Sequence, residues 1–169
     1  MAENSENLLT PLLVFRFHVD FAVDPLVSGA SGNVNLCSGA FSDCTGLEAT
    51  MEPKVIKEGG RNHGPHQRAG QVTWSTVILK RGMTTTRDLW KWFELVGGGS
   101  YSYRLAATIT MFDPQGAAVL AWKLEKAMPI KFKAADLNAK GTEVGVEELH
   151  LAHEGMSLLS EADIKRKFL

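Results

Sequence analysis

The sequence contains few of the residues that specialised folds depend on. Its two cysteines, Cys37 and Cys44, lie in a loop rich in glycine and serine and are too few for a disulfide framework, so we expect a reduced pair. No window approaches eighteen consecutive apolar residues, and no membrane insertion is expected. Eighteen Lys and Arg oppose nineteen Asp and Glu, a balance unlike that of duplex-binding domains.

Motifs for catalysis, metals and cofactors are also missing. The segment GMTTTRD has one glycine and no lysine placed as in a phosphate-binding loop. His63 and His66 lie in a glycine-rich loop, whereas His150 and His153 lie in an expected strand, where residues three apart point to opposite faces. No serine lies in a nucleophile elbow, and no carboxylate pair has a recognisable context. We therefore predict no enzyme, no metal site and no cofactor.

Alternating strand patterns make up most of the chain. In LVFRFHVDF, apolar residues alternate from Leu13 to Phe21, which predicts a half-buried strand. Further segments rich in β-branched or alternating apolar residues predict more strands, with Pro53 at an edge or bulge. The expected strands are 13–21, 47–57, 71–81, 101–113, 117–129 and 143–153. The residues therefore predict a mainly β domain.

One interior helix is expected after the segment LKRGMTTT. Leu89, Trp92, Phe93 and Val96 follow the i, i+3, i+4, i+7 spacing of a buried helix face, and three glycines end the pattern. Thr85 or Thr86 is expected to cap this helix through its hydroxyl. The tail SLLSEADIKRKFL is compatible with a short helix or a frayed segment, and the sequence leaves that choice open.

A second interpretation of this helix is nucleic-acid binding. Trp90 and Trp92 lie among basic residues at positions 80, 81, 87 and 91, an arrangement that could stack the bases of a single strand. The alternative is that Trp92 packs in the core and Trp90 lies at the surface or at a subunit contact. The neutral net charge favours the packing interpretation.

Self-association follows from the strands themselves. Long strands with apolar residues on both faces leave exposed sheet edges, which invite pairing unless they are covered. Several subunits can remove these edges by joining their sheets into one closed barrel. We therefore expect a protein that binds copies of itself.

Three segments in a fixed order carry a family resemblance: F-x-F-x-V near the start, then FSDCTGLEATMEPKVIKEGG, then QVTWSTVILKRGMTTTRDLWKWF. Together they resemble the contractile phage tail-tube family and its relatives in bacterial contractile injection particles, over roughly residues 13 to 158. The resemblance implies one domain, 1–169, of two packed antiparallel sheets that form a small β-barrel with a flanking helix. It includes a flexible 1–12, a long loop 22–46 and a C-terminal extension 156–169.

The resemblance also implies an assembly. Six subunits would form a ring, and rings would stack into a tube inside a contractile sheath, with the polar strand faces lining a channel for DNA or protein effectors. Further partners would be baseplate or spike and tube-terminating proteins, in a virion tail or injection particle made in the bacterial cytoplasm. The loop between Glu48 and Gln71 would meet the next ring. Its predicted contact residues are Glu58, Gly59, Gly60, Arg61, Asn62 and His63.

Two segments depart from the family pattern. The excursion from Ala22 to Ala40 is longer than the usual first connection, and SEADIKRKFL extends beyond the last expected strand. Either addition would suit a tube initiator or an end ring at the baseplate. A secretion component resembling the type VI tube protein is a further alternative with the same fold.

Overall fold

The computed structural model describes residues 12–26 and 41–168. Residues 1–11 of the predicted flexible segment 1–12 and most of the predicted loop 22–46 therefore lie outside the described residues, as does Cys37. The domain boundaries stay predictions.

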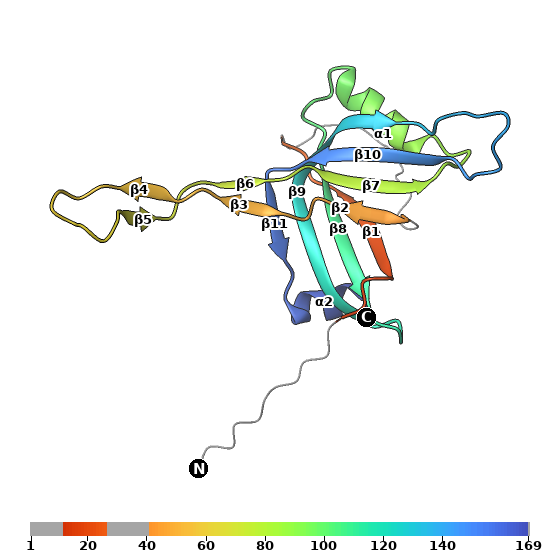
Figure 1. Cartoon of the computed structure of the whole chain (residues 1–169). Helices are drawn as coiled ribbons and strands as arrows, with labels where there is room; N and C mark the ends of the chain where they lie inside the picture. The colour runs from red at the N-terminus through yellow and green to blue at the C-terminus, as the bar shows by residue number, and fades with distance from the viewer. Residues whose placement is uncertain (1–11, 27–40, 169) are drawn as a thin grey trace, which may run out of the picture.

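A seven-stranded antiparallel sheet forms the body of the protein (Figure 1). Six of its strands follow the order β1-β8-β9-β10-β7-β2, and β11 also pairs with β9. The strands are β1 (Phe17–Val23), β2 (Asp43–Thr45), β7 (Val77–Gly82), β8 (Leu105–Phe112), β9 (Ala118–Lys133), β10 (Val146–Ala152) and β11 (Gly155–Leu158). The prediction of a mainly β fold of antiparallel sheets is confirmed.

The long strand β9 bends the sheet into two halves. The first part of β9 pairs with β8 and β11, and its last residues pair with β10. Lys126, at the bend, has a φ of 52°, which is uncommon for a residue with a side chain. It is held by Asp24, whose carboxylate lies 2.6 Å from the Lys126 ammonium and accepts the Lys126 backbone N–H at 3.1 Å. The hydrogen bonds from Lys126 lower the pKa of Asp24.

We call β1, β8, the first part of β9 and β11 the first half, and the end of β9, β10, β7 and β2 the second half. Their strands run in clearly different directions in Figure 1. The hydrophobic core joins both halves. Its wholly buried members include Val19 and Leu124 from the first half, Leu79 and Leu149 from the second, and Trp92 from helix α1 (Asp88–Gly97).

Register separates the first half into two faces. Val19 pairs with Ile109, which pairs with Trp122, so these apolar side chains share the inner face toward the core. His18 pairs with Thr110, which pairs with Ala121, and these side chains share the opposite face because successive residues of a strand alternate. This second set belongs to what we call the outer face. Its described members include Arg16, His18, Asp20, Thr108, Thr110, Phe112, Ala121, Lys123 and Ser157.

A long hairpin projects from the body (Figure 1). We call residues 49–74 the arm. It contains two small antiparallel pairs, β3 (Ala49–Met51) with β6 (Val72–Trp74) and β4 (Lys54–Ile56) with β5 (His66–Arg68). The expected strand 47–57 is therefore split at Pro53, and the expected strand 71–81 is split into β6 and β7. The two backbone segments of the arm approach closely at Gly70, where a side chain would not fit, because a Cβ there would lie 1.8 Å from the carbonyl oxygen of Glu52.

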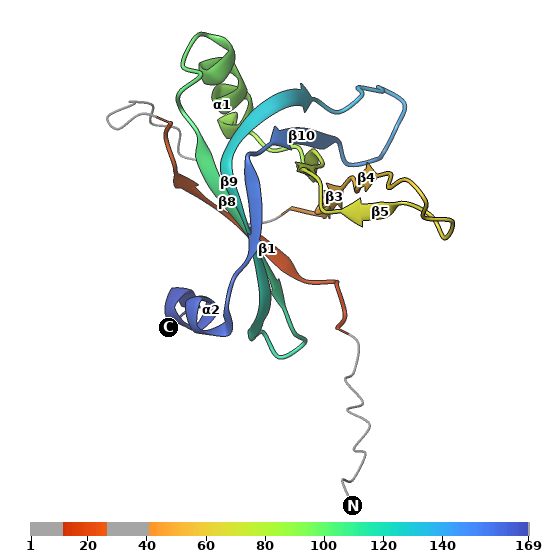
Figure 2. The same ribbon diagram turned by 90° about the vertical axis from the view of Figure 1, so that its left-hand side faces the viewer.

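Two elements near the chain end were not fully predicted. The sequence left open whether the tail is helical, and the structure forms helix α2 (Glu161–Phe168) there. Strand β11 was not predicted, because a turn at His153 and Glu154 separates its four residues from β10. Figure 2 shows α2 beside the lower ends of β9 and β11, near the turn that joins β8 to β9.

Candidate functional site

Three features stand out among the described residues: the buried seat of α1, the exposed tip of the arm, and the polar outer face of the first half. Helix α1 is seated by a buried ion cluster. Arg81 of β7 donates from Nε to Glu147 of β10 at 2.5 Å and from Nη1 to Asp88 of α1 at 3.1 Å, and its Nη2 also donates to Asp88. All three residues are buried. Burial opposes the charge of Arg81, but hydrogen bonds from the two carboxylates outweigh it and raise the pKa of Arg81.

This cluster explains the segment LKRGMTTTRDLWKWF. Arg81 is the second-last residue of β7 and Asp88 is the first residue of α1, so their ion pair spans the polar elbow between them. The prediction of a threonine cap is wrong, because the N-cap is Arg87 and no side chain caps the helix. Thr84 and Thr86 instead hydrogen-bond to each other at 2.6 Å. The elbow is thus fixed by a salt bridge where the sequence suggested a hydroxyl.

The predicted helix-packing residues lie at different depths. Leu89 and Trp92 are wholly buried in the core, and Val96 packs against it. Phe93 is partly buried and lies 5.8 Å from the Trp90 ring, measured between ring centroids. Trp90 is 46% exposed. Because Trp92 is buried, the two tryptophans do not form a common stacking platform.

The six predicted contact residues, 58–63, lie together at the exposed turn between β4 and β5. Glu58 accepts a hydrogen bond from His66 at 2.9 Å, and Arg61 approaches the same imidazole at 2.6 Å. These polar contacts hold the base of the tip. On the shaft of the arm, Val55 and Met51 are each 51% exposed, so the arm offers apolar as well as charged surface.

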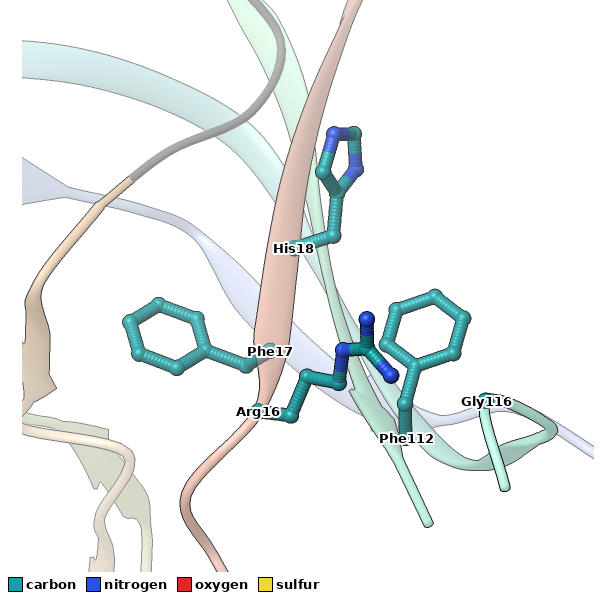
Figure 3. Close-up of a pocket in the computed structure, with 5 residues that line it drawn as sticks. All are labelled: Arg16, Phe17, His18, Phe112 and Gly116. Atoms are coloured by element: carbon teal, nitrogen blue, oxygen red, sulfur yellow. The ribbon is translucent and has the colours of Figure 1, made fainter. Parts of the chain in front are cut away.

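A shallow pocket lies on the outer face, at the end of the sheet near the β8–β9 turn. It is lined by Arg16, Phe17, His18, Phe112 and Gly116. In Figure 3 the Arg16 guanidinium extends toward the ring of Phe112, while Phe17 points to the other side of the strand. The Phe112 N–H donates to the Arg16 carbonyl at 3.0 Å. The pocket thus combines a cation and an aromatic ring on the polar face of the sheet.

His150 and His153, the second pair with the spacing of metal ligands, have different neighbours. His150 of β10 lies 3.6 Å from Glu148, and His153 lies at the turn after β10, 3.0 Å from the Gly155 carbonyl. Among residues 12–26 and 41–168, no group of three or more His, Cys, Asp and Glu residues is arranged to hold a metal ion. The described helices are all too short or too polar to cross a membrane.

The family model of the T4-like virus tail tube protein gp19 matches residues 13–157. The chain belongs to this family. It is a tail tube protein, and the resemblance seen in its three ordered segments is confirmed. Its structure combines a bent sheet, a flanking helix and a projecting arm.

Solved structures agree with the membership. A chain in the cryo-EM structure of the anti-feeding prophage (AFP) baseplate is 26% identical, with a TM-score of 0.76 over 90% of this tail tube protein and 98% of that chain. A chain of the PVC sheath-tube complex is 17% identical, with a TM-score of 0.72 over 90% and 94%. A chain of the AFP tube-terminating cap is 15% identical, with a TM-score of 0.74 over 95% and 99%. No curated protein sequence matches.

The buried ion cluster is the feature that sequence reasoning missed. Arg81 has the same strand parity as Val77 and Leu79, which are wholly buried. An arginine on a buried strand face needs a carboxylate partner, and Asp88 at the helix start is the nearest along the chain. Glu147, 66 residues away, could not have been identified without the β7–β10 register.

Proposed function

We propose that this tail tube protein assembles into hexameric rings that stack into the inner tube of a contractile tail or injection particle. The observation that carries the proposal is the first half of the sheet, which has two open edges and one polar face. Among the described strands, β1 pairs only with β8, and β11 pairs only with β9. Exposed edges of this kind are removed when β11 of one subunit pairs with β1 of the next.

The backbone of β11 fits such pairing. Leu159 donates its N–H to the Ala121 carbonyl of β9 at 2.8 Å. Backbone groups alternate in direction along an antiparallel strand, so the N–H of Leu158 points away from β9. The Leu158 side chain is 59% exposed. The Leu158 N–H could therefore donate a hydrogen bond to a backbone carbonyl of a strand from a neighbouring subunit.

The size of a closed ring is set by the strand count. Four strands from each of six subunits give about 24 strands, and a strand spacing of about 4.8 Å gives a circumference of about 115 Å. With the usual strand tilt of about 35–45°, the barrel would be about 45–52 Å across. The outer face of the first half would line it with threonines, charged residues and small side chains, leaving a hydrated conduit for DNA or protein effectors.

The arm would join one ring to the next. Its tip carries the charged residues of the turn, and its shaft exposes apolar side chains that water does not favour. The contractile sheath would surround the tube, and baseplate, spike and terminating proteins would bind its ends. The role is structural and not catalytic, which family membership supports.

A single backbone donor tests the ring. Leu158→Pro removes the outward N–H without removing a β9 hydrogen bond, and proline is tolerated on edge strands. We expect this variant to be a folded monomer by circular dichroism and solution mass. Leu158→Ala keeps the N–H and should still form rings. Rings of equal abundance in both variants would refute pairing through this edge.

An initiator or end-ring role is the second candidate, favoured by the 26% identity to a chain of the AFP baseplate structure. A repeating subunit alone should grow long tubes, whereas an initiator should stop at one or a few rings. Electron microscopy of the purified protein at rising concentration separates the two. Tubes whose length grows with concentration would exclude the end-ring role.

A further inference from the structure

Helix α2 is an ordered element beyond the residues that match the family model, which end at 157. Ser160 caps it, because the Ser160 hydroxyl accepts the Asp163 N–H at 3.3 Å and also bonds the Asp163 carboxylate at 2.6 Å. The Ile164 N–H donates to the Ser160 carbonyl at 3.0 Å. A cap of this kind fixes the start of a short helix that would otherwise be marginal.

Burial shows which face of the sheet α2 covers. Ile164 is only 4% exposed, yet it does not belong to the cluster that fills the main core. Thr110 and Ala121, which pair across the outer face, are 0% and 1% exposed. On the same face Thr108 and Lys123 are only partly buried.

A cover is therefore present over one end of the outer face. Among the described elements that pack against β9, α1 lies at its other end, where Trp90 meets Phe132. Helix α2 packs against β9 and lies near the β8–β9 turn in both overall views (Figures 1 and 2). It is joined to that end through the hydrogen bond from Leu159 to Ala121. Among the described elements, α2 is therefore the one placed to cover Thr110 and Ala121.

We propose that α2 is a collar on the channel side of the ring, at one end of the conduit. The proposal rests on the proposed ring, because the outer face of the first half lines the channel only if the sheets close. Six copies of α2 would then project inward from the wall. A helix with its side chains is about 10–12 Å across, so the collar would reduce a channel of about 45–52 Å to roughly half that diameter.

The surface of the collar is charged. Glu161, Asp163 and Arg166 are exposed on α2, while Ile164 faces the sheet. Whatever passes through the ring would therefore meet a narrow, hydrated and charged opening instead of the threonines and alanines beneath it. A tube built only of such rings would be constricted at every level, so the collar fits a ring at a defined position in the tube.

Thiol labelling tests the position of α2 without requiring rings. In a background of Cys37→Ser and Cys44→Ser, Ala121→Cys introduces one thiol beneath the helix. Adding Ile164→Glu places a charge in the contact and should release α2, which we expect to raise the maleimide labelling rate about tenfold or more. Ala162→Glu adds the same charge at an exposed position of the same helix and should leave labelling slow. Equal rates in all three proteins would overturn the placement of α2.

Electron microscopy of the rings tests the collar itself. The natural sequence and Ala162→Glu should show density that narrows one end of the channel, and Ile164→Glu should show an open channel at that end. A channel of uniform width in the natural sequence would overturn the collar even if rings form. A failure of every variant to form rings would overturn the proposed function and the collar together, while the labelling result would still report whether α2 covers Ala121.

Discussion

Replacing Arg81 by methionine should strongly destabilise the protein, because the buried ion cluster holds two carboxylates on one cation. Arg81 hydrogen-bonds to both Asp88 and Glu147, and the side chains in these pairs are 6–7% exposed. Removing one member of a buried pair typically costs about 3–5 kcal/mol, because the partner is left as an uncompensated charge. For a chain of this size, that corresponds to a fall in Tm of about 6–20 °C.

Lys80→Met is the matched control, since it makes the same kind of change at the adjacent residue on the other face of β7. The Lys80 ammonium lies 3.6 Å from Asp43 and 3.8 Å from Glu148, and its side chain is 35% exposed. Exposed pairs of this type contribute about 0–1 kcal/mol. Urea unfolding followed by circular dichroism, at equal oligomeric state, gives both free energies. A difference under about 1 kcal/mol between the free energies of unfolding of the two variants would show that the buried ion cluster does not hold the fold together as described.

Three further predictions concern the arm, the bend and the thiol. Gly59→Pro with Gly60→Pro should leave single rings but abolish stacking, because Gly60 has a φ of 86° that proline cannot adopt; unchanged tubes by electron microscopy would contradict the role of the tip. The pKa of Asp24 is lowered, so its stabilisation is present above the ordinary carboxyl pKa and is lost as pH falls through the lowered value. Asp24→Asn should therefore cost about 1 kcal/mol at pH 7, with the difference in unfolding free energy shrinking below about pH 4; a difference independent of pH would count against it. Burial raises the pKa of Cys44 to about 12, so in a Cys37→Ser variant this thiol should react with a disulfide reagent at pH 8 only after unfolding, and rapid reaction of the folded protein would show that it is accessible.

Local patterns predicted the elements whose stability is local. Strand alternation from Leu13 to Phe21 and the stripe through Leu89 and Trp92 each reflect burial of one face of one element. Strand β1 is nevertheless displaced, running from Phe17 to Val23, because the start of a strand depends on where its partner begins. Its partner β8 extends from Leu105 to Phe112, and Phe17 pairs with Met111 near the end of it.

The arm and the bend depend on contacts that are distant in sequence. The pattern in QVTWSTVILKR continues through Ser75 and Thr76, so nothing local shows that β6 pairs within the arm while β7 pairs in the body. Likewise, one continuous pattern spans β9, although the strand serves both halves of the sheet. The bend at Lys126 depends on Asp24, 102 residues away.

The family was predictable, but the arrangement of the surfaces was only partly so. The ordered segments identified the family, and the glycines of residues 58–63 indicated an exposed turn, but the polarity of the outer face required the strand register. The position of α2 could not be predicted from the sequence, because a single apolar residue, Ile164, in a charged tail does not indicate which face of the sheet the helix covers. Glu147 alternates with the buried Leu149 and Leu151, but its pairing with Arg81 follows only from the register of β10 on β7.

Ring closure is tested most directly by the solution mass and electron microscopy of the purified, untagged chain. We expect particles of six subunits with a central channel, alone or stacked, and their loss in Leu158→Pro but not in Leu158→Ala. A folded protein that stays monomeric at every concentration, with or without these substitutions, would contradict the claim that the open edges of this sheet close into a ring.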